Sequence, residues 1–116
     1  MKIVRVYSDS DGESHFEDRD VPLRDSGLVG ALSDKEPATG IVFRTTGPDY
    51  DYDWHNAPER QYVIMLQGEV EIETSDGTVR RLGAGDILLA EDTTGKGHRS
   101  RSVGPGPRQS VFVTLD

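Results

Sequence analysis

The sequence predicts an all-β chain, folded as a jelly-roll β-barrel or sandwich with few or no helices, and three observations support this prediction. Glycine (13 residues) and proline (6 residues) are scattered along the whole chain and separate short segments. No stretch carries a sustained helical period with caps. Hydrophobic residues make up only 34% of the chain, and a jelly roll uses them economically because alternate residues of each strand point inward.

The expected strands are β-branched and aromatic runs bounded by turn residues. In chain order they are Lys2–Tyr7, Ser14–Asp18, Gly40–Thr46, Gln61–Leu66, Glu69–Thr74, Thr78–Leu82, Ile87–Ala90, His98–Val103 and Gln109–Leu115. Gln67-Gly68 between two of these runs predicts a tight hairpin, and Asp76-Gly77 predicts another. The best helix candidate, residues 21–32, is interrupted by Gly27 and Gly30.

We expect one domain over residues 1–116, since this length suffices for one hydrophobic core but not for two. Residues 40–115 should form the core barrel. Residues 1–39 are expected to contribute N-terminal strands and loops that wrap around it.

Alternation along residues 61–66 indicates a strand that is buried on both faces. One face carries Gln61, Val63 and Met65, and the other carries Tyr62, Ile64 and Leu66. One face can line the barrel interior, while the other packs on a second sheet or on a second subunit. The chain is therefore expected to form a homodimer.

In the later strand, His98, Ser100 and Ser102 share one face, and Arg99 and Arg101 take the other. Pointing His98 outward would place two arginines inside, which is costly without partners. The inward orientation of His98 is therefore favoured, and two hydroxyls should point inward with it.

Composition narrows the possible partners and the compartment. A net charge of −8 should repel phosphate backbones and anionic membranes, so neither nucleic acid nor a membrane is expected as a partner. The chain has no cysteine, its first residues lack the apolar stretch of a signal peptide, and no apolar run is long enough to span a bilayer. We expect a cytoplasmic protein with a small-molecule ligand.

Two stretches resemble the motifs of the cupin superfamily, in particular its small single-domain members. In residues 53–68, Gly68 matches the closing glycine of the first motif, His55 its first histidine, and Gln61 stands where the family has a glutamate ligand, while Ala57 replaces the second histidine. In the second stretch, Gly85-Asp86 matches the start of the motif. His98 matches the motif's histidine if the loop before it is longer than usual, and Ser102 replaces the asparagine.

The resemblance implies a metal-ligand set that is incomplete here. Metal-bearing cupins bind Fe, Mn, Ni, Zn or Cu through three histidines and a glutamate, and the surviving positions in this chain are His55, Gln61 and His98. A glutamine carbonyl brings no charge to offset a divalent ion, so binding would be weak unless Glu59 joined the set. A bound divalent metal and a site without any cofactor both remain open.

The acidic and aromatic stretch before His55 suggests further site residues. Glu59, Tyr50 and Tyr52 are the acid/base candidates. The substrate pocket is expected to include Trp54, Ser100, Ser102 and Met65. An arginine inside the pocket would favour a carboxylate-bearing ligand, and the candidates to watch are Arg44, Arg60, Arg99, Arg101 and Arg108.

Structural roles for the same residues are open alternatives. His55 could be a surface histidine paired with a neighbouring aspartate, His98 a hydrogen-bonded core histidine, and Gln61 a side chain that satisfies backbone groups inside the barrel. The aromatic stretch could simply close one end of the barrel.

Three functions fit these observations. The first is a metal-assisted enzyme, a dioxygenase, isomerase or lyase, acting on a small polar metabolite. The second is a metal-free epimerase- or cyclase-type enzyme that uses His55 and His98 as acid and base. The third is a non-catalytic module that binds a small ligand, because a fold alone does not determine a function.

Overall fold

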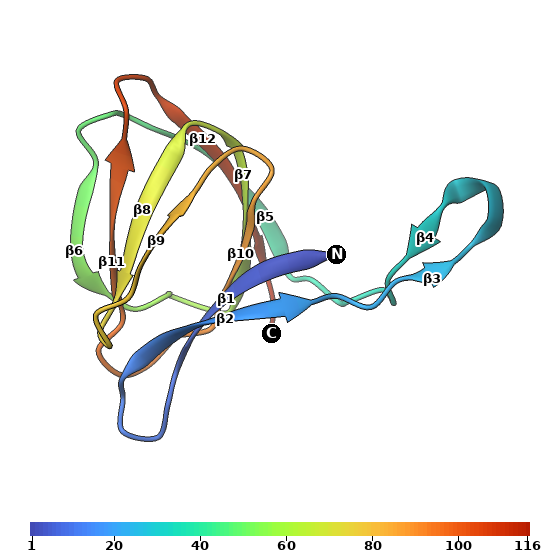
Figure 1. The fold of residues 1–116 in the computed structure, drawn as a ribbon, viewed down its shortest axis with the longest axis horizontal. Coiled ribbons are helices and arrows are strands. Elements are labelled where there is room, and N and C mark those ends of the chain that lie inside the picture. The colour runs from blue at the N-terminus through green and yellow to red at the C-terminus, as the bar shows by residue number, and fades with distance from the viewer.

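The computed structural model describes residues 1–116 and shows two facing β-sheets that form a sandwich (Figure 1). The larger sheet has six strands in the order β2-β1-β10-β7-β12-β5, and the smaller has four in the order β6-β11-β8-β9. The strands of these sheets are β1 (Lys2–Ser8), β2 (Ser14–Asp20), β5 (Gly40–Thr46), β6 (Asp51–His55), β7 (Gln61–Gln67), β8 (Glu69–Thr74), β9 (Val79–Leu82), β10 (Ile87–Ala90), β11 (His98–Val103) and β12 (Arg108–Thr114). The predicted all-β sandwich is confirmed.

The turn at Gly68 moves the chain from one sheet to the other, so the predicted hairpin between β7 and β8 is wrong. Strand β7 pairs with β10 and β12, whereas β8 pairs with β11 and β9. Gly68 has a φ of 79°, and a Cβ there would lie 3.1 Å from the Cα of Arg108. Glycine therefore lets the chain turn this corner against the start of β12. The predicted Asp76-Gly77 hairpin does form, between β8 and β9.

The main hydrophobic core lies between the two sheets. Its buried residues are Val6, Ala57, Val63, Met65, Val70, Ile72, Leu82, Leu88 and Ala90. Along β7 the side chains of Gln61, Val63 and Met65 are buried, whereas Tyr62 and Ile64 are half-buried and Leu66 is exposed. The two faces alternate as expected, but the expectation that both are buried is wrong for the second face. A smaller cluster of Ile3, Leu89 and Leu115 packs on the other face of the large sheet.

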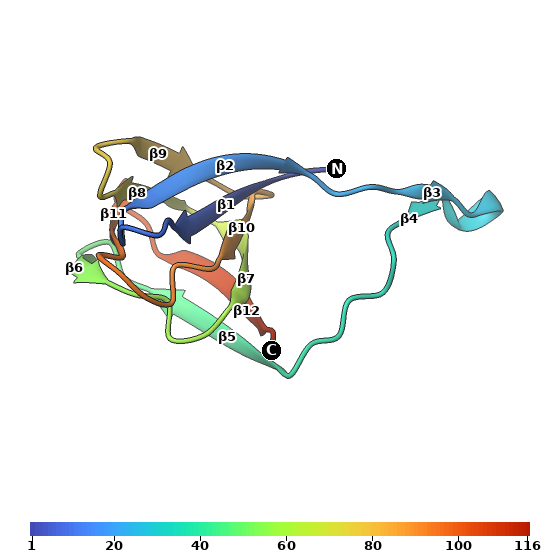
Figure 2. The same cartoon turned by 90° about the horizontal axis from the view of Figure 1, so that it is seen from below.

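Residues 22–39 project from the sandwich as an arm instead of wrapping around it, so that expectation is wrong (Figure 2). The arm carries the two-residue strands β3 (Arg24–Asp25) and β4 (Ala31–Leu32), joined by the 3₁₀ turn η1 (Gly27–Val29). Gly27 and Gly30 both have positive φ, which prevents a longer helix from forming here. Every residue of the arm is exposed.

The turn η1 is the only helical segment of the chain. No helix long and apolar enough to cross a membrane is therefore present.

Candidate functional site

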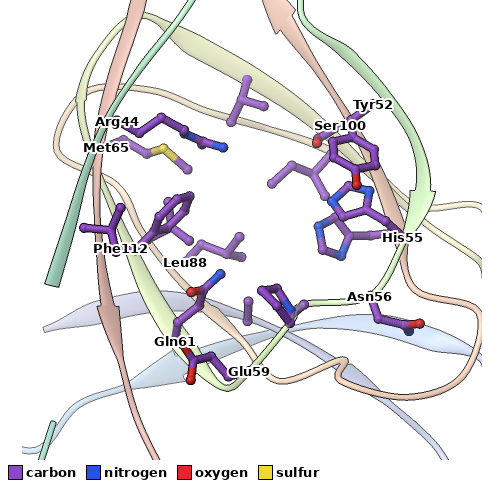
Figure 3. Close-up of a pocket in the computed structure, with 18 of the residues that line it drawn as sticks. Arg44, Tyr52, His55, Asn56, Glu59, Gln61, Met65, Leu88, Ser100 and Phe112 are labelled. Atoms are coloured by element: carbon purple, nitrogen blue, oxygen red, sulfur yellow. The ribbon is translucent and has the colours of Figure 1, made fainter. Parts of the chain in front are cut away.

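A cavity of about 490 Å³ lies between the two sheets, within the usual size range of small-molecule sites (Figure 3). The six-stranded sheet contributes side chains from β5, β7, β10 and β12, and the four-stranded sheet contributes side chains from β6, β8 and β11. Among the residues named from the sequence, the cavity is lined by Arg44, Tyr50, Tyr52, His55, Glu59, Gln61, Met65, His98, Ser100 and Arg108.

A β-bulge in β6 decides which aromatic side chains reach this cavity. His98 pairs with His55, but Ser100 pairs with Tyr52, so one residue of β11 faces two residues of β6. Strict alternation would place Tyr52 and His55 on opposite faces, yet both line the cavity because the bulge inserts an extra residue between them. Residues 51–55, which form β6, were not among the strands expected from the sequence.

Trp54 and Ser102 lie outside the cavity, which corrects their expected role. Trp54 is 41% exposed, and the Arg99 guanidinium carbon lies 5.7 Å from the centre of its ring. Ser102 sits near the end of β11 and donates a hydrogen bond to the carbonyl oxygen of Gly47. The bulge turns Trp54 away from its inward-facing neighbours.

The imidazole rings of His55 and His98 lie together in the cavity, with their centres 4.5 Å apart. His55 is half-buried and His98 is 7% exposed, so neither is a solvent-facing loop residue. The ring of Tyr52 lies 3.9 Å from that of His55, and Tyr52 is itself 52% exposed. Tyr52 therefore stands at the open rim of the cavity.

A hydrogen bond to the backbone fixes the neutral tautomer of His55. Its Nδ1–H donates to the carbonyl oxygen of Asp53 over 2.7 Å, because a carbonyl oxygen can only accept. The proton is thus held on Nδ1, and Nε2 keeps its lone pair. Burial lowers the pKa of His55 from its ordinary 6.5, the bond to Asp53 opposes this effect, and the nearby His98 lowers the pKa further.

His98 is held by a buried carboxylate that the sequence analysis missed. Its Nδ1 lies 2.5 Å from Oδ2 of Asp92, which is fully buried. The backbone carbonyl oxygen of Asp92 accepts hydrogen bonds from the side chain of Asn56 and the backbone N–H of Ala57, next to His55. Asp92 thus fixes the ring of His98 and also joins the two histidine-bearing segments. Its position in the loop before the motif histidine is the one available sequence signal.

Two arginines from the six-stranded sheet also line the cavity, Arg44 on β5 and Arg108 on β12. Arg108 is 2% exposed and Arg44 is half-buried. Tyr50 lies near both guanidinium groups, with its ring centre 5.8 Å and 5.1 Å from their central carbons, and its hydroxyl lies 2.9 Å from Oγ of Ser100. Burial lowers the pKa of both arginines, and the charge of Arg44 lowers that of Arg108 further.

The remaining expected site residues, Gln61, Met65 and Glu59, also line the cavity. Gln61 is 9% exposed and Met65 is 3% exposed, while Glu59 is exposed beside Gln61 (Figure 3). The other arginines that the sequence analysis singled out, Arg60, Arg99 and Arg101, pair with glutamates outside the cavity.

The side chains around His55 and His98 do not suit a divalent metal. Gln61 is a neutral amide, and no three His, Cys, Asp or Glu side chains are grouped so as to hold an ion. The same cavity already holds the positive charges of Arg44 and Arg108 without carboxylate partners, and a dication would add charge of the same sign.

Comparison with known proteins yields matches in structure but not in sequence. No protein-family model matches the chain, and no curated protein does. Among solved structures, a double-stranded beta-helix domain protein from Klebsiella pneumoniae is 28% identical with a TM-score of 0.52, and the match covers 72% of this chain and 79% of that one.

Two further structures carry the name cupin. A cupin 2 conserved barrel domain protein from Salinispora arenicola is 22% identical with a TM-score of 0.53, and the match covers 66% of this chain and 61% of that one. The Cnp3 cupin domain of Schizosaccharomyces pombe is 13% identical with a TM-score of 0.53, and it matches 99% of this chain and 84% of its own length. At these identities the likeness concerns the fold.

Proposed function

We propose that this chain, which has the cupin fold, is an enzyme that transfers a proton on a small polar molecule held between its two sheets. One observation carries the proposal: two imidazoles with centres 4.5 Å apart line one cavity, and each has its Nδ1 engaged by a different acceptor. In both rings Nε2 is thereby the nitrogen left for a ligand. This arrangement supports acid–base chemistry of the isomerase, epimerase or lyase type.

The two histidines have different environments, which suits them to different roles. His55 is neutral at pH 7 because its pKa is lowered by burial, so it is the base. The Nδ1 of His98 lies 2.5 Å from the carboxylate of Asp92, which leaves Nε2 for the ligand, so we assign His98 the role of the acid. One histidine held by a backbone carbonyl oxygen and one held by a carboxylate can divide the roles of base and acid.

Two tyrosines and one glutamate of the cavity can contact the substrate without transferring the proton themselves. Tyr50, bonded to Ser100, places a hydroxyl inside the cavity that can donate to a substrate oxygen. Glu59 and Tyr52 line the open side, where they contact the ligand as it enters.

The proposal is tested by proton exchange, which requires no knowledge of the full reaction. The purified chain is incubated in D₂O with a panel of small hydroxy, keto and sugar compounds, both neutral and acidic, and ¹H NMR follows the loss of carbon-bound protons. We expect exchange on at least one compound, a loss of about 100-fold or more in His55→Gln and His98→Gln, and unchanged exchange in His15→Gln. His15 is the matched control because it pairs with Asp9 and Asp76 outside the cavity.

Absence of exchange in the wild type would leave the non-catalytic binding module as the better account. Full exchange in His55→Gln would instead show that His55 is not the base. The metal-assisted enzyme makes a separate prediction. If the enzyme is metal-assisted, chelator treatment abolishes exchange, and elemental analysis finds a metal in the wild type and less of it in His98→Ala. Under our proposal the chelator leaves exchange unchanged.

A further inference from the structure

The two arginines of the cavity are the only arginines of the chain without a carboxylate partner. The ones that form ion pairs with aspartate or glutamate are Arg5, Arg19, Arg24, Arg60, Arg80, Arg81, Arg99 and Arg101. The chain has 21 acidic and 13 basic residues, so acids are in excess. Even so, none of these acids pairs with Arg44 or Arg108.

This absence of a partner is unfavourable in the unliganded protein. Arg108 is 2% exposed, and its Nε and Nη2 atoms are buried without any hydrogen-bond acceptor. Arg44 is close enough to lower the pKa of Arg108 by repulsion. Buried charges are normally paired, since leaving a charged donor unsatisfied costs more than leaving a neutral one. An anion in the cavity would offset both the repulsion and the missing partners.

The surroundings of Arg44 hold its guanidinium group in place. Its Nε–H donates to Oγ of Ser110 on the adjacent strand β12, and its central carbon lies 4.5 Å from the centre of the Phe112 ring. Stacking and hydrogen bonding of this kind orient the planar group in advance, which lowers the entropy cost of binding an oxyanion. Figure 3 shows Arg44 beside Met65 and Phe112, with its guanidinium directed into the cavity.

The two sheets supply different chemistry to the cavity. Arg44 and Arg108 belong to strands of the six-stranded sheet, whereas His55 and His98 belong to strands of the four-stranded sheet. A molecule lying between the sheets can place an anionic group on the arginine side and a second polar group beside the histidines.

We propose that Arg44 and Arg108 bind an oxyanion group, a carboxylate or a phosphate, of the small molecule on which His55 and His98 act. The inference rests on the proposed function and names the substrate class for the same cavity, a small organic acid or phosphate ester. Guanidinium groups are suited to both anions because their N–H donors match paired oxygens.

Binding of simple anions tests this proposal without a known substrate. Succinate, its neutral analogue succinamide, and inorganic phosphate are titrated into the ¹⁵N-labelled chain, and binding is followed by chemical-shift changes. We expect succinate or phosphate to perturb cavity residues such as Ser100 and to bind at least about 10-fold more tightly than succinamide. Which of the two anions binds more tightly identifies the source of the oxyanion.

Variants locate the anion. Arg108→Gln and Arg44→Gln should each weaken anion binding by roughly 10- to 100-fold. The affinity of Arg108→Lys should lie between that of these variants and that of the wild type. Arg101→Gln should bind the anion as tightly as the wild type. Arg101 is the matched control because it pairs with Glu71 on the outside. A spectrum of unchanged dispersion, recorded without ligand, shows that each variant is folded.

Equal binding of succinate, phosphate and succinamide would overturn the inference, as would undiminished anion binding in the folded Arg44→Gln/Arg108→Gln double variant. The two proposals fail separately. Exchange on neutral compounds without anion binding overturns this inference and supports the proposed function. Anion binding that depends on the arginines, without exchange on any compound, supports the inference and contradicts the proposed function.

Discussion

The backbone of Gly97 lies directly against the carbonyl group of His55. A Cβ at position 97 would be 2.2 Å from the His55 oxygen and 2.5 Å from its carbonyl carbon, both well inside van der Waals contact. Gly97 also has a φ of 73°, where side chains are disfavoured. Since His98 follows immediately, this glycine allows the strands that carry the two histidines to approach one another.

Gly97→Ala should therefore damage both stability and the site. We expect a loss of roughly 3 kcal/mol or more in the free energy of unfolding, because backbone must shift in addition to the conformational strain. Gly104→Ala is the matched control: Gly104 has a φ of 88°, and a Cβ there would meet no other atom within 4 Å. It should cost only about 1 to 2 kcal/mol. Urea unfolding measures both values, and equal losses in the two variants would contradict the steric explanation.

The exchange activity should depend on pH through His55. The pKa of His55 lies below its ordinary 6.5 because the ring is buried, and the base works only when it is unprotonated. As the pH is lowered, loss of the base should therefore reduce the rate only at pH values below 6.5. The measurement is the NMR exchange rate across pH 4.5 to 8, taken where circular dichroism shows the chain folded. A rate that has already halved above pH 6.5 as the pH is lowered would show that another group is the base.

Asp92 should act as a positioning residue through His98. Asp92→Asn keeps an oxygen that can accept from Nδ1–H but removes the negative charge beside His98. We expect exchange to fall by about 100-fold or more, and the acid-base profile to change shape, while succinate binding is retained. Asp92→Ala should in addition destabilise the chain by about 1 to 3 kcal/mol, because it leaves the buried His98 nitrogen unpaired. Wild-type exchange in Asp92→Asn would remove Asp92 from the mechanism.

The homodimer remains a prediction, but the structure points to a different surface for the interface. The outer face of β7 is partly covered by the chain itself, since Tyr62 is half-buried and donates to Glu36. Large exposed apolar side chains lie instead on β5 and on the arm, with Phe43 76% exposed and Leu28 fully exposed. Light scattering should give twice the chain mass, and Phe43→Ser or Leu28→Ser should shift the population toward monomer. A monodisperse wild-type monomer at high concentration would contradict the prediction.

Several features of the site could be predicted from the sequence because they follow from local rules. The two-residue period of a strand was enough to predict that Gln61, Val63 and Met65 share one face. Together with the cost of burying arginines, it also predicted that His98 and Ser100 face inward while Arg99 and Arg101 do not. The resemblance of residues 53–68 and 85–98 to the cupin motifs correctly indicated the fold.

Other features depend on which strands pair, and no local pattern contains that information. The bulge that excludes Trp54 and the corner at Gly68 follow from pairings between distant segments.

The sequence by itself determined that this chain is an all-β protein and that His98 and Ser100 face inward on β11. Only the tertiary structure decided that His98 meets Asp92, and that Arg44 and Arg108 share a cavity without a carboxylate partner. The physical reason is that strand periodicity acts between neighbours in sequence, whereas the pairing or isolation of a buried charge depends on groups brought together from across the chain.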